Sequence, residues 1–293
     1  MNYFKNLCLF VVLSFSCIPV QGQETDVLEI SDSLAPTPFV EGTFRATRVL
    51  NGHSNKLLSE GLLDFRVEHR FGRMNQGYYE FFGLDQATTF FSLEYGIKDW
   101  VMMGLNRSSL DKTVSGFAKF RVFRQHTVTM PVSVSLLLGT SIDGTRWVYP
   151  ERNNLFSSRV SYTGQLIVAR KFNEHFSLQF APVWIHRNLV PTKSDKNDVF
   201  ALGFASSYGI TSTVSLNAEY YPVISPTWNH QNTSYRNALS FGFDIDTGGH
   251  VFQLMLSNTT GMNEKAFITE TTGNWLKGDL HLGFNISRLF SIK

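Results

Sequence analysis

The strongest constraint on the fold is an alternation of apolar and polar residues that begins near residue 57 and recurs along the remaining chain. Between residues 60 and 71, Leu63, Phe65 and Val67 share one parity, whereas acidic and basic residues fill the other. Because successive side chains of a β-strand point to opposite faces, this period of two predicts strands with one apolar and one polar face. Twelve strands are predicted, over 60–71, 87–97, 100–108, 113–124, 131–142 and 159–171, and in six further segments that begin near residues 176, 200, 214, 235, 252 and 279.

The connections between these segments alternate in length. Short turns are expected at 97–100, 172–175, 209–213 and 246–249, a slightly longer one at 125–130, and longer loops at 72–86, 109–112, 143–158, 189–198, 225–234 and 259–277. This arrangement is typical of an outer-membrane barrel, and an even number of strands lets the sheet close without an unpaired edge in lipid. The predicted fold class is all-β: a closed antiparallel transmembrane β-barrel of about twelve strands with a polar lumen.

A soluble β-sandwich shows the same alternation, so other features must separate the two classes. The polar parity is rich in Gly, Ser, Thr and Asn, which suit a watery lumen. Aromatic residues, 14% of the chain, collect near the strand ends on the apolar parity, as they do in interfacial girdles. These features favour the membrane barrel, and a soluble periplasmic β-protein is the alternative.

The N-terminal region is expected to be a targeting signal followed by a flexible segment. Residues 1–22 combine Lys5 with an apolar run, which is typical of a secretory signal peptide. Both cysteines of the chain, Cys8 and Cys17, lie in this segment. Residues 23–42 are acidic and irregular and are expected to be flexible, and residues 43–293 are expected to form the barrel domain.

Several short runs resemble an uncharacterised outer-membrane β-barrel family of Bacteroidetes, which carries a domain-of-unknown-function label. The runs are Asn51-Gly52-His53, His69-Arg70-Phe71-Gly72-Arg73, Phe82-Gly83-Leu84-Asp85, Arg187-Asn188-Leu189-Val190, Gly249-His250-Val251-Phe252-Gln253 and Gly283-Phe284-Asn285-Ile286-Ser287-Arg288. The resemblance covers about residues 43–290. It implies the barrel fold and the outer-membrane location, and it implies no activity.

The sequence carries no constellation that an enzyme would need. Gly-rich phosphate loops, HExxH, GxSxG and cysteine-metal spacings do not occur. His53 beside Ser54 is faintly similar to an outer-membrane phospholipase motif, but neighbouring strand residues point apart, so a polar turn before the first strand is the better interpretation. The sequence therefore predicts no enzyme, catalytic residue, metal site or cofactor. Because 26 basic residues stand against 24 acidic ones, no nucleic-acid partner is expected.

Charged residues on the polar parity are the candidate lumen-lining set: Glu60, Asp64, Arg66, Glu68, Arg70, Glu94, Lys119, Arg121, Glu219, Arg236, Asp244 and Asp246. The acids concentrate on strands that become neighbours after closure, whereas Lys119 and Arg121 lie on the far wall. One interpretation is a transverse field across a narrow pore. The other is local neutralisation of the acids by Arg66, Arg70 and Arg236, which fills the lumen with ion pairs.

The loop over residues 72–86 contains four aromatic residues, Tyr78, Tyr79, Phe81 and Phe82. Such rings seldom lie in water without being buried. The hypothesis is that this loop folds into or across the barrel as a constriction or short plug, and the alternative is a self-packed surface loop.

The function that this pattern favours is a passive channel or small-solute transporter with a polar, charged lumen, located in the outer membrane of a Gram-negative bacterium. The alternatives are a non-conducting envelope barrel that acts as a binding or assembly partner, and a lipid-modifying barrel enzyme. The expected partners are outer-membrane lipid, the barrel-assembly machinery and small polar solutes.

Overall fold

The computed structural model describes residues 39–190, 192–193, 195–225 and 235–292. The expected signal peptide, residues 1–22, lies outside the described residues, as does most of the segment 23–42 that was expected to be flexible.

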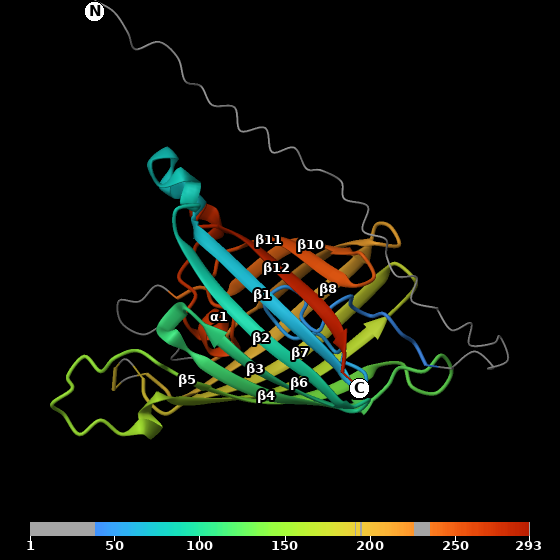
Figure 1. Cartoon of the computed structure of the whole chain (residues 1–293), viewed down its shortest axis with the longest axis horizontal. Coiled ribbons are helices and arrows are strands. Elements are labelled where there is room, and N and C mark those ends of the chain that lie inside the picture. Colours follow the sequence, from blue (N-terminus) through green and yellow to red (C-terminus); the bar gives the residue numbers. More distant parts are fainter. Residues whose placement is uncertain (1–38, 191, 194, 226–234, 293) are drawn as a thin grey trace, which may run out of the picture. The chain divides into compact units, whose positions relative to one another are not determined.

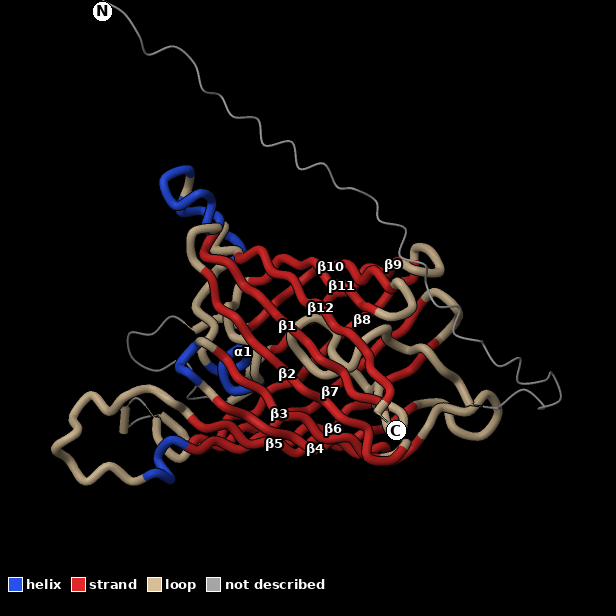
Figure 2. Tube along the Cα trace, in the orientation of Figure 1, coloured by secondary structure: helices blue, strands red, loops and turns tan. Residues whose placement is uncertain are grey.

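The described chain forms one closed antiparallel barrel, which confirms the predicted fold class (Figures 1 and 2). Every strand pairs with its neighbours in sequence, and β1 pairs with β12 to close the ring, with Leu63 opposite Phe290 and Arg70 opposite Gly283. The twelve strands are β1 Leu62–Arg73, β2 Ala87–Lys98, β3 Val101–Ser108, β4 Val114–Phe123, β5 Ser133–Ile142, β6 Val160–Lys171, β7 Phe176–Arg187, β8 Asp198–Gly209, β9 Val214–Tyr221, β10 Ala238–Asp246, β11 His250–Ser257 and β12 His281–Ser291.

The two ends of the barrel differ as the connection lengths predicted. One end, the turn end, carries the short connections such as β2–β3 and β10–β11, together with the start of β1 and the end of β12. The other end, the loop end, carries the long connections, among them β1–β2 with the 3₁₀ helices η1 (Met74–Gln76) and η2 (Tyr78–Gly83), and β11–β12 with the helix α1 (Glu264–Thr269) and the 3₁₀ helix η5 (Trp275–Lys277). The long and short connections lie at opposite ends of the tube in Figure 1.

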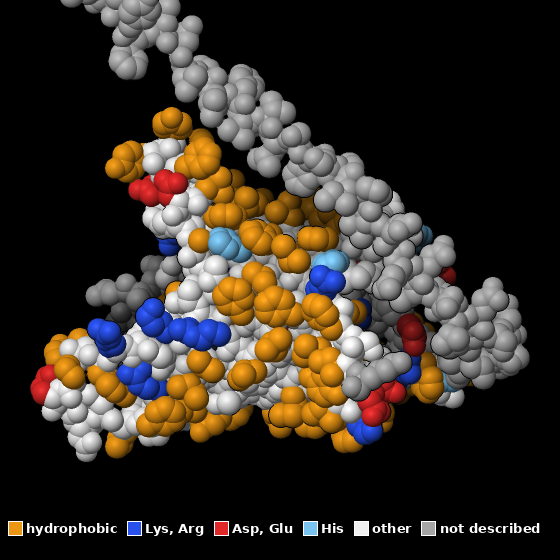
Figure 3. Space-filling view, viewed as in Figure 1, with side chains coloured by type: hydrophobic (Ala, Val, Ile, Leu, Met, Phe, Trp, Pro, Cys, Tyr) orange, Lys and Arg blue, Asp and Glu red, His pale blue; other side chains and the backbone are white. Residues whose placement is uncertain are grey.

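The two faces of the wall follow the alternation in the sequence. On β1, Asp64, Arg66 and Glu68 are buried inside, whereas Phe65 is exposed on the outer face. The outer face carries a broad cover of hydrophobic side chains (Figure 3). Such a face suits contact with lipid acyl chains, and the closed ring leaves no strand edge unpaired there.

The interior is not an open tube. Residues 39–61 enter from the turn end, ahead of β1, and their central part, residues 43–58, lies inside the barrel as a bent loop (blue in Figure 1). From the loop end, the β11–β12 connection turns inward, and α1 buries Phe267 and Ile268 completely. Two separate segments of the chain therefore fill the lumen from opposite ends.

Because alternate side chains of each strand point outward to lipid, a charge placed at an outward position should destabilise the folded barrel. We expect Leu105→Arg, near the middle of β3 with an outward side chain, to lower the free energy of unfolding by about 2–4 kcal/mol, because a cation at mid-membrane depth is poorly solvated. Urea unfolding of protein folded in vesicles, followed by heat-modifiable migration on a gel, measures the change. The control is Val148→Arg, on the exposed β5–β6 loop, for which we expect little change; equal losses in both variants would contradict the lipid-facing assignment.

Candidate functional site

The candidate site is the filled lumen, and its central element is the plug segment, defined here as residues 39–61. The segment turns back on itself at Val49–Gly52, where the Val49 amide donates to the Gly52 carbonyl at 2.8 Å and the Ser54 amide donates to the Thr47 carbonyl at 2.9 Å. An isolated antiparallel bridge joins Arg48 to His53. Within residues 39–61 no strand forms, so the plug segment lies inside the wall without belonging to it.

Two charged wall residues hold the main chain of the plug segment. Glu219 on β9 accepts hydrogen bonds from the amides of Asn51 (2.8 Å) and Gly52 (3.1 Å). Lys119 on β4 donates from Nζ to the carbonyls of Thr47, Ser54 and Lys56, at 3.3, 3.1 and 2.8 Å. Both wall charges are therefore satisfied by peptide groups.

Amide side chains of the wall extend this pattern. Gln179 on β7 accepts from the Asn55 amide at 3.0 Å and donates to the His53 carbonyl at 2.8 Å. Gln253 on β11 and Asn285 on β12 donate to the carbonyls of Val49 and Leu50, at 2.7 and 2.9 Å. A buried peptide group costs free energy unless it is hydrogen-bonded. These side chains therefore provide the hydrogen bonds that a neighbouring strand provides elsewhere in the barrel.

Ion pairs join the plug segment to the wall and to α1. The guanidinium of Arg48, fully buried, lies 3.7 Å from Glu68 on β1, 3.9 Å from Glu94 on β2 and 3.5 Å from Glu264 on α1. Within β1, Arg66 pairs with Asp64 at 3.3 Å and Arg70 with Glu68 at 3.6 Å. Asp64, Glu68 and Glu94 therefore have cations next to them. Glu219 and Asp244 instead accept hydrogen bonds from amide groups.

His53 and Ser54 do not form a nucleophile–base pair. Ser54 donates from its hydroxyl to the Ala46 carbonyl at 2.6 Å, and the His53 ring packs edge-on against Phe117 with centroids 4.4 Å apart. Burial, assisted by the nearby Arg48 guanidinium, lowers the pKa of His53 well below its usual range, so its ring is neutral beside Glu264 at neutral pH. The run 51–55 is a turn, as predicted, but it lies inside the lumen.

Apolar residues on the inward parity mark where the filling segments pack. Leu57 and Leu58 of the plug segment contact a patch of Met102, Phe117 and Leu137 on β3–β5. Leu50 packs with Ala169, Ala205 and Met255, and α1 packs through Phe267 and Ile268 on a patch that includes Val183, Ile185 and Tyr221. The inner wall is therefore a mosaic of polar groups and apolar patches, where the sequence had predicted a polar lumen.

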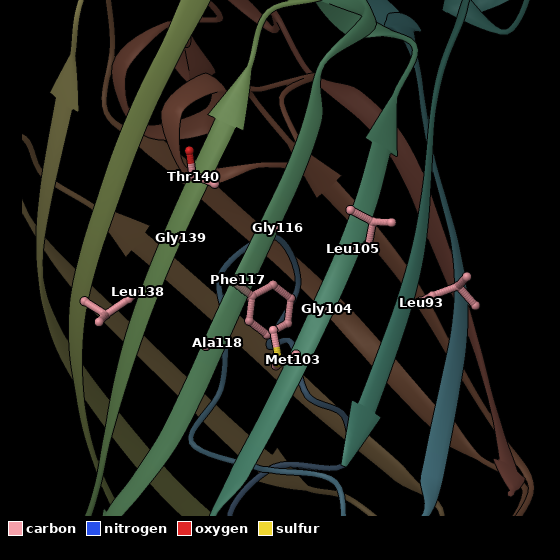
Figure 4. Close-up of a pocket in the computed structure, with 10 residues that line it drawn as sticks. All are labelled: Leu93, Met103, Gly104, Leu105, Gly116, Phe117, Ala118, Leu138, Gly139 and Thr140. Carbon is pink, nitrogen blue, oxygen red and sulfur yellow. The ribbon is translucent and has the colours of Figure 1, made fainter. Parts of the chain in front are cut away.

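The lumen contains a cavity of about 500 Å³ at the turn end, and the plug segment forms part of its lining. Its lining includes Arg45, Lys56, Lys171, Glu174 and Asp246, so cations and acids both face it. A different depression, of about 620 Å³, lies over the small residues Gly116 and Ala118 on the outer face of β3–β5 (Figure 4). Because outward side chains such as Leu105 and Leu138 border it, this second depression faces lipid and is no part of the lumen site.

Most of the predicted lumen-lining residues lie inside the barrel. The buried members are Asp64, Arg66, Glu68, Arg70, Glu94, Lys119, Glu219 and Asp244, and Arg121 and Asp246 are half-buried. Two of the predicted residues do not line the lumen: Glu60 lies exposed at the turn end, where it pairs with Lys98, and Arg236 is exposed at the loop end. Both residues lie just outside a strand, where the two-residue period no longer fixes the side-chain direction.

The predicted constriction loop also required correction. The side chains of Tyr78, Tyr79, Phe81 and Phe82 are 84, 90, 55 and 51% exposed, and the β1–β2 loop points away from the lumen. The lumen is filled by residues 39–61 and by α1, which sequence reasoning missed. A usable signal was present, because Met102, Phe117, Leu137 and Ile167 place large apolar groups on the otherwise polar parity.

Among the described residues, no three His, Cys, Asp or Glu side chains are grouped so that they could hold a metal ion. No helix in the described part of the chain is long and apolar enough to cross a membrane.

A closed barrel with an apolar outer face and a lumen filled by its own chain is the architecture of a membrane β-barrel protein. The family model described as "Membrane bound beta barrel domain (DUF5777)" matches residues 44–290, and the chain belongs to this family. An even number of antiparallel strands in a single chain is the form of bacterial outer-membrane barrels, so the protein is located in the outer membrane of a Gram-negative bacterium.

Solved structures that align with much of this chain include outer-membrane porins and an outer-membrane channel. The NanC porin has a TM-score of 0.47 at 10% identity, and the KdgM porin 0.46 at 8%; each alignment covers 79% of this chain and 99% of the porin. An outer membrane channel of Pseudomonas putida F1 has a TM-score of 0.45 at 12% identity, covering 80% of this chain and 98% of the channel. No curated protein matches the chain.

The buried ion pairs of Arg48 predict that removing this side chain strongly lowers the free energy of unfolding. We expect Arg48→Ala to lower the free energy of unfolding by about 3–5 kcal/mol, because Glu68 and Glu94 remain buried without their shared cation. Urea unfolding of the folded protein in vesicles measures this. The control is Lys98→Ala, which removes an exposed ion pair with Glu60 and should change stability little. A loss in Arg48→Ala no larger than in the control would show that the Arg48 network does not stabilise the fold.

Proposed function

We propose that the protein is an outer-membrane channel for small polar solutes that is closed at rest by its own plug segment, and that solutes pass only when this segment leaves the lumen. The observation that carries the proposal is that the wall is complete without residues 39–61. The ring closes through β1 and β12, and β1 begins at Leu62, after the plug segment has ended. Withdrawal of the plug segment would therefore break no strand pairing.

The contacts between plug and wall support the closed resting state. Leu50, Leu57 and Leu58 are almost fully buried, and each such side chain contributes about 1.5–3 kcal/mol on burial. Spontaneous withdrawal would return these groups and the wall patches to water. Thermal motion alone would therefore open the lumen rarely, and passage would depend on an event that pulls or displaces the segment.

The chemistry of the wall supports polar solutes as the cargo. Glu219, Lys119, Gln179, Gln253 and Asn285 now bind peptide groups of the plug segment. With that segment displaced, the same charged and amide side chains would line the passage on several strands and offer both donors and acceptors. The turn-end cavity, with Lys171, Glu174 and Asp246 of the wall at its border, would form the entrance on that side.

A second candidate is a non-conducting envelope barrel, and the observation that favours it is α1. The β11–β12 connection fills the lumen from the loop end, where Met262, just before α1, and Phe267 and Ile268 of α1 are fully buried. If α1 blocks the lumen on its own, withdrawal of the plug segment would leave a deep cavity and no through passage.

Planar-bilayer recording of two matched deletions separates the candidates. We expect the full chain to show almost no conductance, and a variant lacking residues 43–56 to show discrete conductance steps, because the closed wall remains and the residues that fill its lumen from the turn end are gone. The control deletion removes residues 145–154 from the β5–β6 loop, leaves the plug segment in place and should stay closed. Heat-modifiable migration on a gel confirms that each variant is folded. A folded plug deletion that does not conduct would overturn the channel proposal and support the non-conducting barrel.

A cysteine pair tests the same movement in a full-length chain. The chain's two cysteines precede the barrel and can be replaced by serine. Cysteines at Asn51 and Ser240, whose side-chain atoms Nδ2 and Oγ are 2.8 Å apart, would tether the plug segment to β10. We expect conductance events only after reduction of the tether, and their persistence in the oxidised protein would show that the passage does not depend on this segment.

A further inference from the structure

The β1–β2 loop ends in an aromatic tip, defined here as residues 78–82. The tip lies outside the lumen, and its four aromatic rings are exposed. Tyr78 and Tyr79 are 84 and 90% exposed, and Phe81 and Phe82 are more than half exposed. Phe81 and Phe82 also adopt positive φ values of 44° and 54°, which non-glycine residues rarely hold and which cost free energy. A strained backbone that presents four rings to the outside indicates that something else covers them.

The base of this loop is fixed, so the direction of the tip is set by the barrel. The Met74 amide donates to the Leu280 carbonyl at 2.8 Å, and Asn75 donates from Nδ2 to the Asp279 carboxylate at 2.7 Å. The tip then extends sideways from the wall at the loop end instead of continuing along the barrel axis (cyan in Figure 1). It therefore lies at the level where the outward apolar face of the strands ends.

Exposed apolar side chains on β2 and on η5 lie next to the aromatic tip and extend its apolar surface. The strands that carry the tip have outward Phe91 and Leu93 on β2, so the lipid-facing surface leads up to it. On the adjoining η5, Leu276 is 97% exposed, and Trp275 packs edge-on against the outward Phe241 of β10. Lys277 stands exposed beside these apolar groups. Aromatic rings with a nearby cation are the composition found where protein meets lipid headgroups.

We propose that the aromatic tip, together with Leu276, lies in the headgroup region of the outer leaflet and contacts the lipid that surrounds the barrel. Tyr and Phe rings bury their apolar faces at that depth, while the tyrosine hydroxyls remain in contact with water and headgroups. The tip would then act as a lateral anchor that sets the depth and the rotation of the barrel at its β1–β2 side. This contact is independent of whether the lumen conducts.

Depth-dependent fluorescence quenching tests the proposal on the full chain. In a chain whose Cys8 and Cys17 are replaced by serine, Tyr79→Cys introduces a single cysteine, which is labelled with nitrobenzoxadiazole. The folded protein is then reconstituted in phosphatidylcholine–phosphatidylglycerol vesicles. Nitroxide-bearing lipids report contact with lipid, and iodide reports contact with water. The matched aqueous control is Val148→Cys, 81% exposed on another loop of the same end, and the membrane control is Leu105→Cys on the outward face of β3. Leu276→Cys provides a second position on the proposed surface.

We expect headgroup nitroxides to quench the labels at positions 79 and 276 at least about twofold more than the label at 148, with iodide quenching reduced in the same order. Acyl-chain nitroxides should quench position 105 most strongly. Equal quenching by both agents at positions 79 and 148 would overturn the proposal. Protection from iodide without quenching by lipid nitroxides would also overturn it, because it would show that protein, such as a second copy of the chain, covers the tip.

Discussion

The rest of the structure depends on one constraint: inside a bilayer, every backbone hydrogen bond must be made within the protein. The antiparallel ring meets this constraint because each strand pairs on both sides and β1 pairs with β12. Closure also divides the side chains of each strand into two populations. Outward positions such as Phe65 must tolerate lipid, and inward positions such as Arg66 are freed to carry charge. The alternation of apolar and polar residues in the sequence results from this division of side chains between lipid and lumen.

The number of strands then creates a second requirement. A barrel of about eight strands is filled by its own side chains, whereas sixteen or more leave an aqueous channel. A ring of twelve lies between these cases, so its lumen needs water or additional chain to fill it. Residues 39–61 and the β11–β12 connection provide that chain, and Arg48 and Glu264 meet where the two segments approach each other. The filling is asymmetric, since one segment precedes the wall and the other links two of its strands.

The difference between the wall and the segments that fill it explains why the strands could be predicted from the sequence and the plug segment could not. Strands over residues such as 87–98 were predictable because lipid on one side and enclosed polar groups on the other impose a strict period. The plug segment obeys no period, since it is surrounded on all sides, and Phe44, Val49 and Leu50 fall at irregular spacings. The aromatic loop was misplaced for a related reason: its composition demands burial, but composition does not say whether lumen or lipid provides it. The inward apolar residues Met102 and Leu137 were the overlooked sign that a further segment packs inside.

The way the plug segment is held bears on whether it can move. A segment joined to the wall by strand pairing would have become a thirteenth strand, and its departure would open an edge. Apart from main-chain hydrogen bonds at its two ends, at Val40 and Gly61, the segment is bound by side chains of the wall. Glu219 accepts from its amides, and Lys119 donates to its carbonyls. When such contacts are lost, water can replace each partner from within the lumen, which a lipid-facing edge does not permit. Within the membrane-spanning part that the structure describes, a segment of backbone inside the lumen can therefore exchange its hydrogen bonds without exposing them to lipid, whereas a gate built from one of the twelve strands would have to break the ring.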